Sequence, residues 1–113
     1  VSVAVAEAFE DAGQPYPINT GEDQQDYLQA WKKAGFKGIA PTYPAFQWRT
    51  AVMAALMTLK GEPIPGPNWV LPQPSITAKE LDKYVNPKLA PLHYSMCGCE
   101  GMPGYPQRWG GKQ

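Results

Sequence analysis

The chain has 113 residues, 43% of them hydrophobic, and its ten acidic and ten basic residues give no formal net charge. This length allows one domain with a small core. The lack of a basic surplus argues against nucleic acid as the main partner. No apolar run approaches the roughly 20 residues that a membrane-spanning helix needs.

The first half of the chain alternates helical and extended patterns. Apolar residues at helical spacing predict helices over 1–12, about 23–34 and 45–60, and each is followed by a glycine that can end it. Two short strands are predicted between them, at 17–20 and 37–42. Because strands joined by helices run parallel, this order predicts an α/β fold with a mainly parallel sheet.

The second half of the chain is less regular. Many of the thirteen prolines and eleven glycines of the whole chain lie in 61–74 and 86–111, where we expect turns and loops. Between these stretches, "SITAKELDKYV" predicts the last helix. Thr77 and Glu80 in it have the spacing of a capping box, so we expect Thr77 to cap this helix.

Two carboxylates, Glu22 and Asp23, stand where the first predicted strand passes into a helix. One interpretation is helix capping, because a carboxylate stabilises a helix N-terminus by roughly 0.3–1 kcal/mol. The other is ligand binding, because ligands of α/β sheets bind outside the carboxyl ends of the strands. The residue types alone leave both interpretations open.

A C-x-C motif is formed by Cys97 and Cys99, with His93 shortly before it. A disulfide, a metal site and a pair of redox-active thiols are the three alternatives. Zinc prefers four ligands, and a fourth good ligand is missing from this stretch. No nucleophile with a matched base and no phosphate-binding loop is visible, so we do not expect an enzyme.

Four stretches of the sequence resemble the C-terminal end of periplasmic sugar-binding proteins of the ribose-binding type, the solute-binding subunits of ABC importers. They are "TGEDQQDYLQAW", "GIAPTYPAFQW", "ALMTLKGEPIP" and "VLPQPSITAKELDKYV". The resemblance covers about residues 1–85 and implies part of a C-terminal α/β lobe. In this family the lobe is a three-layer sandwich with a mainly parallel sheet. Residues 86–113 would be a Pro-, Gly- and aromatic-rich C-terminal extension.

The resemblance also implies a ligand site. Family members carry an acid in the turn after the strand, and this acid accepts hydrogen bonds from sugar hydroxyls. It falls on Glu22 or Asp23, which leaves capping to the other. Thr42 and Tyr43 occupy the place of a polar family residue that precedes a proline, and both are implied as ligand contacts. Ribose binders carry Gln there, so the resemblance does not extend to ribose itself.

The function that the resemblance implies is capture of a sugar or related polyol and its delivery to the membrane permease subunits of an ABC importer. The expected location is the periplasm, or the cell surface of a Gram-positive host. We expect no cofactor and no metal. In an exported protein we expect Cys97 and Cys99 to form a disulfide, with each other or across two chains.

The resemblance further implies that the chain is a fragment, because the family's N-terminal lobe has no counterpart in it and the chain starts without Met or a signal peptide. Half a cleft is not expected to hold sugar by itself. Exposed sheet edges would favour a homodimer. Two alternatives remain: a redox or metal-binding protein that uses Cys97 and Cys99, and the ligand-sensing domain of a transcription regulator, which has the same fold.

Overall fold

The computed structural model describes residues 2–43, 47–64, 66, 68, 70 and 73–96. They divide into two compact units. The first unit contains the described residues of 2–43 and 74–96, and the second contains those of 47–73. None of the helices in the described part is long and apolar enough to cross a membrane.

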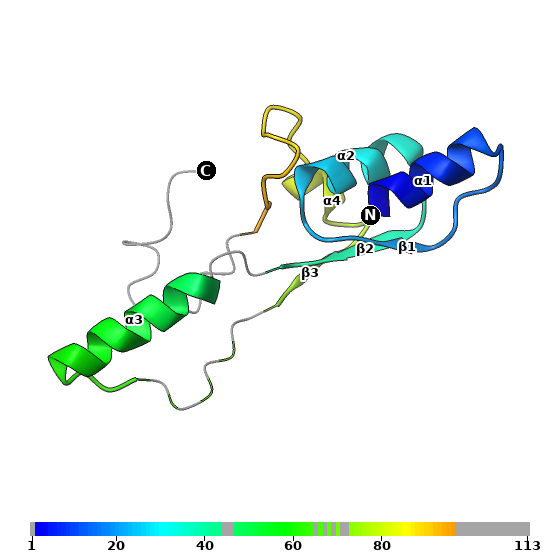
Figure 1. Ribbon diagram of the computed structural model, residues 1–113. Helices are drawn as coiled ribbons and strands as arrows, with labels where there is room; N and C mark the ends of the chain where they lie inside the picture. The colour runs from blue at the N-terminus through cyan, green and yellow to red at the C-terminus, as the bar shows by residue number, and fades with distance from the viewer. Residues whose placement is uncertain are drawn as a thin grey trace. The chain divides into compact units, whose positions relative to one another are not determined.

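The first unit is a small sheet with helices on one of its faces (Figure 1). The strands are β1 (Asn19–Thr20), β2 (Gly38–Pro41) and β3 (Ser75–Ile76), and the helices are α1 (Ser2–Asp11), α2 (Gln25–Ala34) and α4 (Leu81–Tyr84). The strand order is β1-β2-β3, with β1 parallel and β3 antiparallel to β2. The predicted α/β class is therefore confirmed, with a mixed three-stranded sheet.

The antiparallel strand β3 differs from the sequence-based expectation. It occupies Ser75–Ile76, directly before the predicted cap residue Thr77, and α4 begins only at Leu81. Ile76 pairs with Ala40 of β2, and both side chains are fully buried. Burial beside a neighbouring strand favours the extended backbone here, and a strand of two residues leaves no periodicity to detect.

The capping box at the start of α4 forms only in part. The Glu80 carboxylate accepts hydrogen bonds from the Thr77 backbone N–H at 3.3 Å and from the Thr77 hydroxyl at 3.0 Å. The first of these is the bond in which a capping-box acid reaches back. The Thr77 hydroxyl donates to Glu80 instead of accepting from the helix, and Glu80 itself is the N-cap residue.

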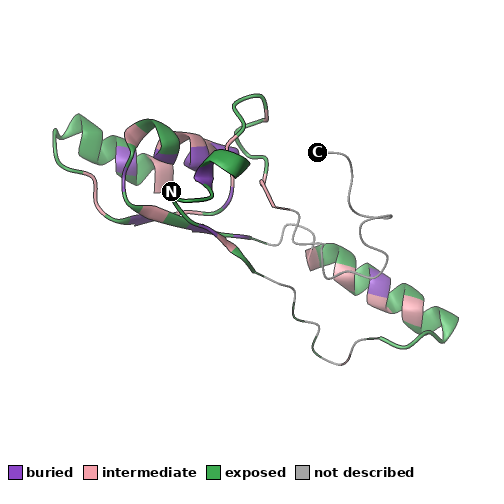
Figure 2. Cartoon of the chain, turned by 180° about the vertical axis from the view of Figure 1, so that it is seen from behind, coloured by how far each residue is buried: buried purple, intermediate pink, exposed green. Residues whose placement is uncertain are grey.

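The core of the first unit forms around α2. Tyr27, Leu28 and Trp31 are buried against Phe36 and the sheet. Figure 2 shows the buried positions of the chain in purple. The Trp31 indole N–H donates to the Phe36 carbonyl at 2.7 Å, and the two rings stack with centroids 6.3 Å apart. The polar atom of Trp31 is thus satisfied inside an apolar cluster.

The second unit contains α3 (Gln47–Lys60), close to the predicted helix at 45–60. Met53 is its buried residue. Trp48, Val52 and Leu56 are exposed and follow each other at intervals of four residues. This spacing places them on one face of α3, which is an apolar stripe.

We predict that Gly21→Ala destabilises the first unit by about 1–3 kcal/mol, the usual cost of overpacking. A Cβ at Gly21 would lie 2.5 Å from the ring of Tyr27. Urea denaturation followed by tryptophan fluorescence measures the loss. In a Tyr27→Leu background, where the ring is absent, the same substitution should cost much less. Equal costs in both backgrounds would show that the ring is not the cause.

Candidate functional site

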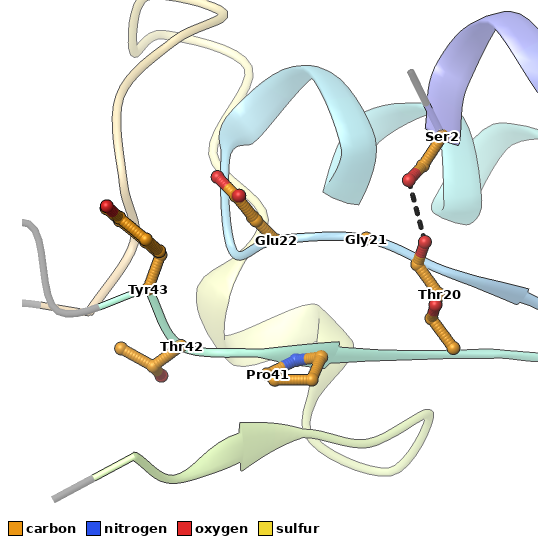
Figure 3. A pocket seen from close by; sticks show the side chains of 7 residues that line it. All are labelled: Ser2, Thr20, Gly21, Glu22, Pro41, Thr42 and Tyr43. Atoms are coloured by element: carbon orange, nitrogen blue, oxygen red, sulfur yellow. Dashed lines mark hydrogen bonds between the residues drawn. The ribbon is translucent and has the colours of Figure 1, made fainter.

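A pocket of about 310 Å³ lies at the carboxyl ends of the parallel strands β1 and β2 (Figure 3). Its lining residues are Ser2, Thr20, Gly21, Glu22, Pro41, Thr42 and Tyr43. The crossover through α2 brings the ends of both strands to the same edge of the sheet, which is where α/β folds bind ligands. Ser2 of α1 closes one side, since its hydroxyl donates to the Thr20 carbonyl at 2.7 Å.

Glu22 and Tyr43 present their polar groups at this pocket. Both side chains point to the same side of the strands, whereas Thr42 points to the opposite side (Figure 3). Glu22 is exposed, and its Oε2 accepts a hydrogen bond from the Tyr94 hydroxyl at 2.9 Å. The rings of Tyr43 and Tyr94 pack with centroids 5.8 Å apart. A carboxylate and an aromatic ring are thus both accessible at the pocket.

Thr42 lines the pocket but does not offer its hydroxyl to it. The residue is buried, and its hydroxyl contacts the Met96 sulfur at 2.8 Å. Its backbone N–H donates to the Pro74 carbonyl at 2.8 Å, which continues the pairing of β2 with the strand that follows Pro74. Thr42 therefore contributes shape to the pocket rather than a hydrogen-bonding side chain.

Asp23 is completely buried and is not among the pocket-lining residues. Its Oδ1 accepts the Tyr43 backbone N–H at 3.1 Å, and its Oδ2 accepts the Met96 backbone N–H at 2.7 Å. Burial raises the pKa of this carboxyl, the two N–H donors oppose the rise, and the nearby Glu22 charge adds to it. Asp23 thus connects three chain segments instead of facing a ligand.

The prediction that Glu22 or Asp23 caps α2 is wrong. The helix begins at Gln25 with Gln24 as the N-cap residue, and no cap bond comes from the Gln24 side chain. The backbone N–H groups of Gln25 and Asp26 donate to the carbonyls of His93 and Pro91, at 3.0 and 2.8 Å. A distant segment of the chain thus supplies the acceptors that the first turn of a helix lacks.

Residues 86–96 therefore belong to the first unit, and the boundary expected after residue 85 does not coincide with the end of this unit. Gln25 holds the segment from the side of α2. Its buried amide donates to the Tyr84 carbonyl at 2.8 Å and to the Ser95 hydroxyl at 2.6 Å, and it accepts the Asn86 N–H at 2.8 Å. Every hydrogen-bonding group of a buried amide needs such partners.

Tyr94 is the residue at the site to which the sequence analysis assigned no role. It contacts both Glu22 and Tyr43, yet lies 72 residues from Glu22 in the sequence. Neither helical nor strand periodicity marks it, because residues 91–96 form no regular element beyond an isolated bridge of Tyr94 with Gln24. No signal in a single sequence connects such a pair.

Cys97 and Cys99 lie outside the described residues, so the expected disulfide stays a prediction. His93 is described, and its side chain is exposed. Among the residues that the structure describes, no group of three or more His, Cys, Asp or Glu side chains could hold a metal ion.

Comparison with known proteins finds no family model, no curated protein and no solved structure that matches this chain. The resemblance to periplasmic sugar-binding proteins therefore stays a prediction, and the geometry of the pocket is the basis for the proposals below.

We predict that Asp23→Asn destabilises the first unit by about 1–3 kcal/mol, although it removes a buried charge. The amide keeps one acceptor oxygen but turns its NH₂ group toward one of the two backbone N–H donors, which then loses its partner. Chemical denaturation measures the change. The control is Asp82→Asn, which affects only an exposed ion pair with Lys32 and should cost less than about 1 kcal/mol.

The cost of Asp23→Asn should also depend on pH. The folded protein holds the Asp23 proton more tightly than the unfolded chain, in which this carboxyl has the ordinary aspartate pKa of 3.8. The stability from protonated Asp23 is therefore fully present below pH 3.8 and is lost as pH rises through the higher folded pKa. Asn does not titrate, so the substitution should cost more at pH 4 than at pH 7. A cost that grows with pH would contradict the raised pKa.

Proposed function

We propose that this chain carries part of the sugar-binding cleft of an ABC importer's solute-binding protein. The observation that supports the proposal best is the exposed carboxylate of Glu22 at a pocket outside the carboxyl ends of two parallel strands. A carboxylate accepts hydrogen bonds from sugar hydroxyls, and such charge-assisted bonds are strong. None of the described residues that line the pocket carries a positive charge, which favours hydroxyl donors over anionic ligands.

The pocket suits a small polyhydroxy ligand. Its volume of about 310 Å³ is at the lower end of the range of small-molecule sites. Oε2 of Glu22 is already bonded to Tyr94, so we assign Oε1 to the ligand hydroxyls. The half-exposed Tyr43 adds a ring face against which the apolar face of a sugar can pack. In this proposal Glu22 and Tyr43 contact ligand, and Asp23 and Thr42 support them.

We also propose the three-layer sandwich for the complete fold. Helices α1, α2 and α4 lie on one face of the sheet. Along β2 Ala40 is buried and its neighbour Ile39 is 37% exposed, and this alternation places Ile39 on the other face. Parallel sheets usually have both faces covered by helices. A second helix layer on the Ile39 side would bury this face.

The wider setting follows from the same proposal. The protein would work in the periplasm, or at the cell surface of a Gram-positive host, and would deliver its sugar to permease subunits. A second lobe would close the cleft. In the described sheet β1 and β3 are the edge strands, and pairing of such edges in a homodimer would cover their backbone groups.

An NMR titration tests this function. The ¹⁵N-labelled chain is titrated with D-ribose, D-xylose, D-glucose, D-galactose and D-glucitol. At least one of them should shift the backbone amides of Gly21, Glu22 and Tyr43. The pocket on this chain leads us to replace the expectation that half a cleft holds no sugar. We expect weak binding with a roughly millimolar dissociation constant, because a pocket open on one side buries little of the ligand.

Glu22→Gln should weaken this binding about tenfold, since hydrogen bonds to a charged group are worth about 1.5–3 kcal/mol. The charge-matched control is Glu7→Gln on α1, an exposed residue that does not line the pocket, and it should leave the binding unchanged. If none of the five compounds shifts these amides at about 100 mM, a concentration far above the expected dissociation constant, the proposal is wrong.

A further inference from the structure

We propose that Tyr94 is a positioning residue, which holds the Glu22 carboxylate and the Tyr43 ring in the orientation that ligand requires. This inference rests on the proposed sugar-binding function. It assigns a role in binding to a residue that does not line the pocket and that lies in the segment after residue 85. Tyr94 would act through Glu22 and Tyr43, and not by touching the sugar.

The backbone of Tyr94 is fixed from both sides. The preceding residue, His93, accepts the Gln25 N–H at 3.0 Å, and the following residue, Ser95, donates its N–H to the Asp23 carbonyl at 2.9 Å. Tyr94 itself forms a bridge with Gln24. The partners of these three residues are Gln25, Gln24 and Asp23, which directly follow Glu22 in the chain. The Cα of Tyr94 is thus held firmly relative to the pocket.

Both the hydroxyl and the ring of Tyr94 contact residues of the pocket. Its hydroxyl donates to Glu22 Oε2 at 2.9 Å, and its ring packs against Tyr43 with centroids 5.8 Å apart. An exposed Glu side chain otherwise samples many rotamers, and ligand binding would have to order it. A partner that already holds the carboxylate reduces this entropic cost of binding.

The Tyr94 hydroxyl remains a donor at all physiological pH values. Its pKa is raised to about 12, first by burial and then by the hydrogen bond to Glu22 and the Glu22 charge. The phenol can therefore donate to Oε2 of Glu22 throughout this pH range. This bond leaves Oε1 of Glu22 for the ligand hydroxyls.

The first test needs no ligand. The phenol of Tyr94 is titrated by ¹³C NMR in the wild-type chain and in Glu22→Gln. Removal of the carboxylate should lower the pKa of Tyr94 below about 12, because both the hydrogen bond to Glu22 and the Glu22 charge raise it. An unchanged titration would show that the two groups are not coupled and would overturn the positioning role.

The second test is a double-mutant cycle with the five compounds named above. Tyr94→Phe keeps the ring and removes the hydroxyl, and it should weaken sugar binding about three- to tenfold, the equivalent of one hydrogen bond. In a Glu22→Gln background the same change should have little further effect. A purely structural defect would instead weaken binding equally in both backgrounds.

Tyr84→Phe is the matched control. Tyr84 is a partly buried tyrosine of α4 that packs against the core, and it does not line the pocket. This variant should bind like the wild type. If the wild type and Tyr94→Phe bind equally well while Glu22→Gln binds weakly, the positioning role is wrong and the proposed function stands. If the wild type binds none of the five compounds, the proposed function fails and the positioning role fails with it.

Discussion

The candidate site depends on the buried carboxylate of Asp23. Removing a carboxylate from water is costly, and here the compensation comes from backbone N–H groups of Tyr43 and Met96 rather than from a cation. These two donors belong to segments that follow β2 and α4, 20 and 73 residues away along the chain. One side chain therefore joins the ends of β1 and β2 to the segment that carries Tyr94.

At the start of α2, polar groups are likewise satisfied by a segment that is distant in the sequence. Here the helix supplies the donors, the N–H groups of Gln25 and Asp26, and residues 91–93 supply the acceptor carbonyls. A loop that packs against a helix terminus satisfies polar groups on both sides at once. The buried Gln25 amide adds three further bonds to the same region. Residues 86–96 are thus integral to the unit that bears the pocket.

The sequence was sufficient to predict those parts of the structure that follow from local patterns. The helical spacing of apolar residues predicted α2, whose Tyr27, Leu28 and Trp31 are buried, and Gly35, at a φ of 68°, ends this helix as expected. The two parallel strands and the position of Glu22 after the first of them were predicted in the same way. Strand β3 could not be predicted, because its two residues are extended only by pairing with β2.

The sequence could not predict which of Glu22 and Asp23 faces the pocket. Both are acidic, and what separates their roles is the direction in which each side chain points. Gly21, directly before them, lies so close to the Tyr27 ring that a Cβ there would be 2.5 Å from it. After this close approach the next two side chains lie on different sides of the chain, and Asp23 is buried while Glu22 is exposed. Gly21, which packs on this core ring of α2, is thus the immediate chain neighbour of Glu22, the one accessible carboxylate among the described residues that line the pocket.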